Sequence, residues 1–247
     1  MSGQCLLCGY RCDTAQQCEA VPCCCWCRDE ARELHAKEAS ALLKLEEIKP
    51  AFFIWSEGWQ EDLPKRRESQ PAKVFPGLQL YIGDMDDAAD VQGLIKRRIG
   101  CVVNLCAERI DQAGYEMFVV NLARAGIHHH LLVAHDDCHF DIIAIAEYVI
   151  ESIAVALRTS GVLVFCWAGC NRSAAVTVAY LTMKCGVPLF AAVEQSMKKR
   201  GTILTNQSFR KQLVRQCFKK GLNLEGSDVP AALMVAAEED VAVGEDD

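Results

Sequence analysis

The chain has 247 residues, 51% of them hydrophobic, which is enough to bury one good core and leaves room for appendages. Its formal net charge is −7 and it has no basic stripe interleaved with aromatic residues, so the composition argues against a nucleic-acid-binding protein. No apolar run approaches the about 18 residues of a membrane-spanning helix, and the N-terminus lacks the basic and then apolar pattern of a signal peptide. We therefore expect one main domain in a soluble, cytoplasmic protein.

The first segment, residues 1–27, holds eight of the fifteen cysteines of the chain. Two Cys-x2-Cys pairs in it have the spacing of a four-thiolate zinc site and predict a structural zinc ion. The ligands of that site are predicted to be Cys5, Cys8, Cys24 and Cys27. Because cysteines this dense also fall at that spacing by chance, two other interpretations stay open. One is acylation of the cysteines within residues 23–27, with peripheral attachment to a membrane, and the other is a disordered, redox-sensitive tail.

Residues 28–72 are expected to form a helix and a linker. Apolar residues recur at helical spacing over residues 28–48, which predicts an amphipathic helix that ends near Pro50. The aromatic patch at 51–59 is expected to dock on the body of the chain or on a partner. The charged, Pro-bearing stretch after it is typical of a linker.

Strands alternating with helices are predicted from Lys73 to about residue 220, and this alternation indicates an α/β domain. The predicted strands lie at 74–75, 78–82, 100–105, 127–133 and 162–165. The predicted helices cover 83–94, 112–125 and 142–157, start at Ser173 and at Pro188, and end with one entered through Asn206. The helix at 142–157 and the one after Ser173 are apolar nearly all round, so both are expected to be buried. Residues 221–247 are rich in Ala and acidic residues and predict a disordered tail.

Cys166 lies where the predicted strand 162–165 turns into the helix that opens at Ser173. At such a turn the backbone N–H groups of the loop and of the first helical turn converge and form a cradle for a phosphate-sized dianion. The same positive field favours a thiolate at Cys166. Arg172 supplies a planar fork that can hold two phosphate oxygens.

With Gly169 at the bend of the loop, this segment resembles the phosphate-binding loop of cysteine-dependent protein phosphatases, and the chain around it resembles their dual-specificity branch. The resemblance spans about residues 73–220. It implies a central mixed, mostly parallel sheet of about five strands flanked by helices, with the Cys-rich segment as an N-terminal extension. It also implies hydrolysis of phosphotyrosine, phosphoserine and phosphothreonine in phosphoprotein substrates through a phosphocysteine, with no cofactor for catalysis.

The resemblance assigns a role to each residue of the loop. Cys166 is the nucleophile, Arg172 holds the phosphoryl oxygens, and Ser173 assists release of the thiolate. The phosphate is bound by the loop residues Trp167, Ala168, Gly169, Cys170 and Asn171.

An enzyme of this type needs a carboxylic acid to protonate the leaving oxygen and then a carboxylate to deprotonate the attacking water. Asp136 is our choice, because it keeps a family-like offset to Asp141, which is expected to cap the next helix. Asp137 remains the alternative. The nearby run His128 to His130 does not predict a metal site, because alternation along a strand places His129 opposite its two neighbours.

Phe165 stands where the family has a histidine before the nucleophile, and we expect slower turnover as a result. Three alternative functions stay open. One is a catalytically weak or inactive module that binds phosphoproteins, which Phe165 favours and the intact Cys, Asp, Arg and Ser set opposes. The second is an RNA or glycan phosphatase on the same fold. The third is a sulfurtransferase-like domain, which the upstream aspartate does not suit.

Overall fold

The computed structural model describes residues 3–4, 11–12, 25–49, 70–107, 112–226 and 229–234. The chain divides into two compact units, residues 1–44 and 45–247. The first unit contains a short antiparallel pair, β1 (Gly3–Gln4) and β2 (Arg11–Cys12), and most of helix α1 (Cys25–Glu47). The predicted zinc ligands Cys5, Cys8 and Cys24 and the side chain of Cys27 lie outside the described residues. The predicted zinc site therefore stays a prediction.

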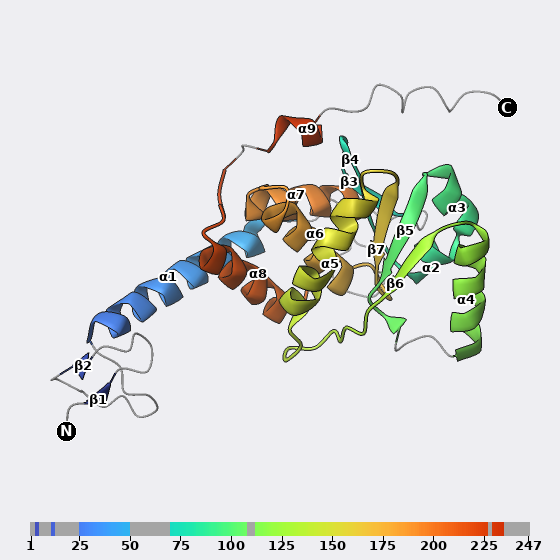
Figure 1. Ribbon diagram of the computed structural model, residues 1–247. Coiled ribbons are helices and arrows are strands. Elements are labelled where there is room, and N and C mark those ends of the chain that lie inside the picture. Colours follow the sequence, from blue (N-terminus) through green and yellow to red (C-terminus); the bar gives the residue numbers. More distant parts are fainter. Residues whose placement is uncertain are drawn as a thin grey trace, which may run out of the picture. The chain divides into compact units, whose positions relative to one another are not determined.

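The second unit is an α/β domain built around one five-stranded sheet (Figure 1). Its strands are β3 (Ala72–Phe75), β4 (Leu78–Gly83), β5 (Ile99–Asn104), β6 (His128–Leu131) and β7 (Gly161–Phe165). The sheet order is β3-β4-β7-β5-β6, in which β3 and β4 pair antiparallel and every other pair is parallel. This confirms the predicted mixed, mostly parallel sheet.

Helices cover both faces of the sheet (Figure 1). On one side lie α2 (Met85–Ala89), α3 (Val91–Lys96) and α4 (Gln112–Arg124). On the other lie α5 (Ile142–Ala156), α6 (Arg172–Met183), α7 (Leu189–Arg200) and α8 (Gln207–Lys220). The central strand β7 is buried along its whole length, and α6 is buried over eleven consecutive residues, Arg172 to Thr182. The loop that joins them is therefore held by the core.

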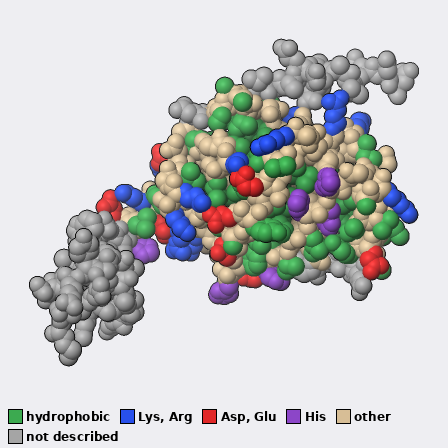
Figure 2. Space-filling view, viewed as in Figure 1, with side chains coloured by type: hydrophobic (Ala, Val, Ile, Leu, Met, Phe, Trp, Pro, Cys, Tyr) green, Lys and Arg blue, Asp and Glu red, His purple; other side chains and the backbone are tan. Residues whose placement is uncertain are grey.

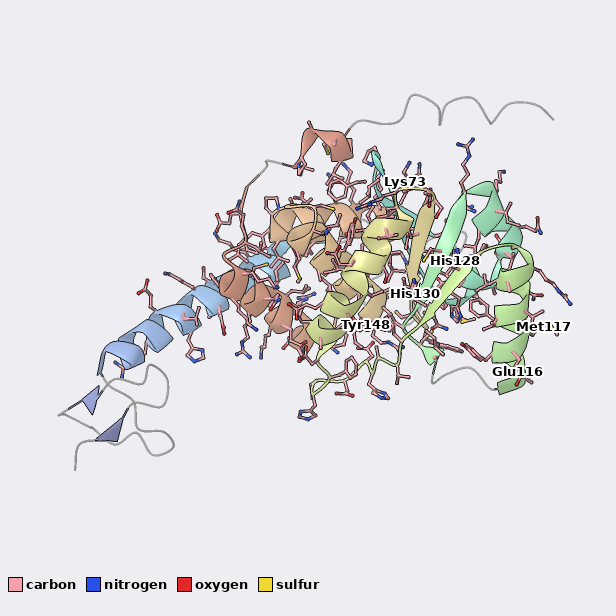
Figure 3. All side chains as sticks on the ribbon, in the orientation of Figure 1. Lys73, Glu116, Met117, His128, His130 and Tyr148 are labelled. Carbon is pink, nitrogen blue, oxygen red and sulfur yellow. The ribbon has the colours of Figure 1, made fainter. Side chains whose placement is uncertain are left out.

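Two helix predictions need correction. The helix expected over 83–94 is two helices, because the side chain of Asp90 accepts a hydrogen bond from the Gly93 N–H and caps α3 as a new helix. Helix α5 is not buried all round. One face packs on the sheet and on α6, but Tyr148, labelled in Figure 3, is 75% exposed and Val155 is 58% exposed. Apolar character alone did not show that α5 is an outer helix of the layer.

Part of the tail predicted to be disordered, residues 221–247, is ordered. Residues 229–234 include a single helical turn, α9 (Ala231–Met234). Its Leu233 side chain is buried, and the Leu233 carbonyl accepts a hydrogen bond of 3.0 Å from the Gly77 N–H at the β3–β4 turn. Over the described parts of the chain, no helix combines the length and the apolar character that crossing a membrane requires.

Candidate active site

Cys166 is the first residue after β7, at the bottom of a cavity of about 290 Å³. The residue is only 2% exposed, because β7 and α6 are both part of the core. Its Sγ lies 3.3 Å from the Oγ of Ser173 in the first turn of α6. A hydroxyl at this distance can donate a hydrogen bond to a thiolate.

The loop from Cys166 to Asn171 bends sharply at Gly169, as the sequence predicted. Gly169 has a φ of +66°, which is in the left-handed region. A Cβ there would also lie 2.7 Å from the Gly83 carbonyl oxygen. Both facts restrict this position to glycine. Backbone hydrogen bonds fix the rest of the loop, since Trp167 accepts from the Met85 N–H at 3.4 Å and Cys170 from the Leu204 N–H at 2.9 Å.

Arg172 is the first residue of α6 and is 3% exposed. Its Nη1 donates hydrogen bonds of 2.9 Å to the carbonyls of Leu105 and Ala134. Leu105 follows β5, and Ala134 follows β6 by a few residues. The ends of two neighbouring strands therefore orient the guanidinium, and Arg172 lines the same cavity as Cys166.

A buried arginine that the sequence analysis missed supports the phosphate loop at Gly169. Arg200, at the end of α7, is fully buried. Its two terminal nitrogens lie 2.8 Å from carboxylate oxygens of Asp84 and Asp87, and its Nε donates to the Gly169 carbonyl at 3.3 Å. In the sequence, Lys199 and Arg200 indicated only the end of a helix. Asp84 and Asp87, the partners of Arg200, had one signal in the sequence. Their Asp-x-x-Asp spacing is typical of a capping box, and in the structure they form one on α2.

The two candidate acids are in different environments. Asp136 is exposed and lines the cavity, where its two carboxylate oxygens accept hydrogen bonds from the side-chain amides of Asn171, at 3.0 Å, and Asn206, at 2.9 Å. Asp137 instead accepts from the backbone N–H groups of His139 and Phe140, so its carboxylate stabilises a local turn. This difference favours Asp136 as the acid. Asp141 caps α5 as predicted.

Most of the predicted phosphate-binding residues line this cavity. Trp167, Ala168, Cys170 and Asn171 do so, together with two threonines that the sequence analysis did not single out, Thr202 and Thr205. Trp167 is 44% exposed. Gly169 does not line the cavity. It contributes through the bend that it allows.

The three histidines of β6 behave as the alternation predicted. His128 is exposed, whereas His129 packs against the rings of Tyr115 and Phe118. Burial, together with the nearby His130, lowers the pKa of His129. His128 and His130 are labelled on β6 in Figure 3, and Figure 2 shows histidines beside apolar side chains on this side of the domain. Among the described residues, no three His, Cys, Asp or Glu side chains are placed to bind a metal ion.

Comparison with known proteins points in the same direction as the geometry. Human dual specificity protein phosphatase 9 is 31% identical over 160 residues, which is 64% of this chain and 38% of that protein. Human dual specificity protein phosphatase 26 is 33% identical over 144 residues, which is 58% of this chain and 64% of that protein. The chain thus spans less than two thirds of the length of these relatives.

Solved structures share the fold. A mouse putative dual specificity phosphatase complexed with zinc tungstate has a TM-score of 0.53 at 24% identity, over 69% of this chain and 100% of its own. The human tyrosine phosphatase-like serine/threonine/tyrosine-interacting protein has a TM-score of 0.50 at 23% identity, over 62% of this chain and 97% of its own. Residues 80–217, more than half of the chain, match the family model described as dual specificity phosphatase, catalytic domain. This chain belongs to the dual specificity phosphatase family.

Proposed function

We propose that this chain is a protein phosphatase that hydrolyses phosphotyrosine, phosphoserine and phosphothreonine through a phosphocysteine. One observation carries the proposal. Cys166, Arg172 and Asp136 come from two separate segments of the chain and line a single cavity of about 290 Å³, with Ser173 in contact with the sulfur. These groups are a nucleophile, an anion clamp, an acid and a thiolate stabiliser, which are the parts that the reaction needs.

In the first step the Cys166 thiolate attacks phosphorus, and the bond from phosphorus to the side-chain oxygen of the substrate breaks. Arg172 and the loop N–H groups hold the three other oxygens while charge spreads over them. Asp136 gives its proton to the departing oxygen. In the second step a water molecule gives a proton to the Asp136 carboxylate and attacks phosphorus, so that phosphate leaves and the Cys166 thiolate is restored.

The cavity supports activity toward more than one phosphorylated residue. Two of the side chains that line it, Asp136 and Trp167, are exposed, so we infer that the cavity admits phosphorylated side chains of different length. A short phosphoserine side chain can then reach the sulfur as well as a longer phosphotyrosine. Arg172 and the loop amides supply the positive charge, so the proposed mechanism uses no metal. Action in the cytoplasm fits this chemistry, because a reducing compartment keeps a nucleophilic thiol reduced.

A binding module without turnover is the second candidate, and Phe165 is the observation that favours it. The Phe165 side chain is fully buried directly behind Cys166, and its ring packs edge-on against Phe118 with the ring centroids 5.9 Å apart. No polar group on this side chain can support the loop. The cradle and Arg172 would still bind a phosphorylated peptide.

Hydrolysis of phenyl phosphate by the purified chain, with a chelator present, separates the two candidates. We expect the wild type to be active, Cys166→Ser to be inactive, and Asp136→Asn to lose about 10²–10⁴-fold in rate. Cys185→Ser, which changes a thiol outside the cavity, is the matched control and should keep wild-type activity. An inactive wild type that still binds phosphopeptides through Arg172 would replace the enzyme with the binding module.

A further inference from the structure

The Asp136 carboxyl group is exposed, yet both of its oxygens are fixed by amide donors from two different elements. Asn171 Nδ2 donates to Oδ2 at 3.0 Å from the phosphate loop, and Asn206 Nδ2 donates to Oδ1 at 2.9 Å from the start of α8. An exposed side chain held at both oxygens loses most of its freedom to rotate. Its position relative to the loop is thereby set by two side chains.

The two asparagines are themselves held in place. Asn171 occupies the cap position of α6 but makes no side-chain capping bond there. Its Oδ1 instead accepts from the Asn206 N–H and from Thr205 Oγ1, both at 3.1 Å. The Oδ1 of Asn206 caps α8 by accepting from the Ser208 N–H at 3.0 Å. Each amide therefore has its oxygen committed to the scaffold and its nitrogen directed at Asp136.

The residues that follow Asp136 are hydrogen-bonded to α8, the helix that Asn206 caps. Ser208 Oγ donates to the Cys138 carbonyl at 2.8 Å. Gln212 Nε2 donates to the Phe140 carbonyl at 2.8 Å, and Gln212 Oε1 accepts from the Ile142 N–H at 2.9 Å. Helix α8 thus holds the backbone on the C-terminal side of Asp136, while the two asparagines hold its carboxyl group.

We propose that Asn171 and Asn206 are positioning residues that hold the Asp136 carboxyl group at the leaving-group side of the phosphate loop. The inference rests on the proposed function. Each carboxyl oxygen accepts one amide hydrogen bond and keeps a lone-pair site for the proton that is delivered to the leaving oxygen or taken from water. The clamp can therefore persist in both protonation states. Because Asn171 belongs to the phosphate loop, it links the acid directly to the cradle that holds the phosphoryl group.

The test compares two substrates that differ in their need for an acid. Phenyl phosphate releases a phenol about as basic as tyrosine, with a pKa of about 10, which must be protonated as it leaves. Nitrophenyl phosphate releases a stable anion that needs little protonation. Asn206→Ser keeps an oxygen that can cap α8 but removes the amide donor to Asp136. We expect it to lower kcat about tenfold or more on phenyl phosphate and less than about threefold on nitrophenyl phosphate, with KM unchanged on both.

Asn171→Ala should lower kcat more on phenyl phosphate than on nitrophenyl phosphate, as Asn206→Ser does. Asn121→Ser, the same chemical change as Asn206→Ser on the exposed side of α4, should match the wild type. In an Asp136→Asn background, Asn206→Ser should add no further loss, because the clamp acts through Asp136. Equal losses on both esters, or losses that add to that of Asp136→Asn, would overturn the clamp.

Amide hydrogen exchange keeps the two proposals separate. We expect faster exchange over residues 134–141 in Asn206→Ser than in the wild type, and unchanged exchange in β7 and α6. A wild type that hydrolyses neither ester would overturn the proposed function. Unchanged exchange over 134–141 in the variant would overturn the clamp even if the enzyme is active.

Discussion

The phosphate loop and the segment that carries Asp136 line one cavity, but they are held by different forces. Cys166, Arg172 and Ser173 are all buried, between a central strand and a buried helix. Residues 135–139 are all exposed and are attached by polar side chains of α8 and by Asn171. The first half of the site is part of the hydrophobic core, and the second is docked on its surface.

We therefore expect substitutions in the two halves to have different effects, on stability in the buried half and on rate in the docked half. A substitution that disturbs the buried half changes the core and should appear mainly as lost stability. A substitution in the docked half leaves the core intact and should appear mainly as lost rate, because the acid is no longer held where it is needed. Variants in each half test that division.

The largest effect is expected at Arg200. Replacement by Met would leave Asp84 and the fully buried Asp87 carboxylate without the guanidinium that lies 2.8 Å from each of them. Removing one partner of a buried ion pair costs about 3–5 kcal/mol, and here the Gly169 carbonyl also loses a donor. Urea unfolding of Arg200→Met measures the loss.

An exposed pair provides the control for Arg200. Lys184 Nζ lies 2.7 Å from Glu151 Oε1, and both side chains are largely in solvent. Lys184→Ala should therefore lower the free energy of unfolding by less than about 1 kcal/mol. If Arg200→Met loses no more than Lys184→Ala, the phosphate loop does not depend on the buried network.

The buried half of the site could be predicted from the sequence, because the residues that form it are close together in the chain. A strand, Cys166, five residues, Arg172 and a helix lie within one short stretch, so elementary helix and loop chemistry predicted the cradle. The order of strands and helices likewise predicted the sheet. The cap at Asp141 followed from the same local patterns, whereas the role of Ser173 came from the resemblance to the phosphatase family.

The parts of the site that were not predicted from the sequence depend on contacts between residues far apart in the chain. Arg200 meets Asp87 across 113 positions, and Asn206 meets Asp136 across 70. No local pattern links such positions, and a single Arg at a helix end is more often a solvated residue. The exposed face of α5 was not predicted either. The apolar pattern of a helix does not show whether another helix covers its outer side.

Gln212 tests the docked half. Gln212→Leu removes the hydrogen bonds to the Phe140 carbonyl and from the Ile142 N–H. We expect a loss of about 1–2 kcal/mol in unfolding free energy, much less than for Arg200→Met. The kcat on phenyl phosphate should nevertheless fall about tenfold, because the segment that carries Asp136 is released. A variant that loses stability but keeps full kcat would contradict the division.

Phe165 tests whether the buried half can be improved. Asn104 lies opposite Phe165 in the β5–β7 register, and among the described residues its buried Nδ2 has no hydrogen-bond partner. A histidine at 165 could accept from this nitrogen and add a polar support behind Cys166. We expect Phe165→His to raise kcat severalfold while losing about 1–2 kcal/mol of stability with the Phe118 contact. Phe165→Leu, which stays apolar, should not raise kcat.

The smallest effect is expected in the pH dependence of stability at His129. Burial and the nearby His130 lower the pKa of His129 in the folded protein, whereas in the unfolded chain the pKa is about 6.5. Below about pH 6.5 the unfolded chain therefore binds a proton that the folded protein rejects, and the free energy of unfolding falls as the pH falls. His129→Phe removes this proton uptake. Urea unfolding between pH 7.5 and 5.5 should then show a shallower decline than in the wild type.

His135 supplies the comparison from the docked half. It is exposed at the start of the segment that carries Asp136, with its ring packed edge-on against Phe140. His135→Gln is the control variant, because it removes one histidine and leaves the half-buried His129 in place. A decline in His129→Phe as steep as that in the wild type and in His135→Gln would contradict proton uptake at His129.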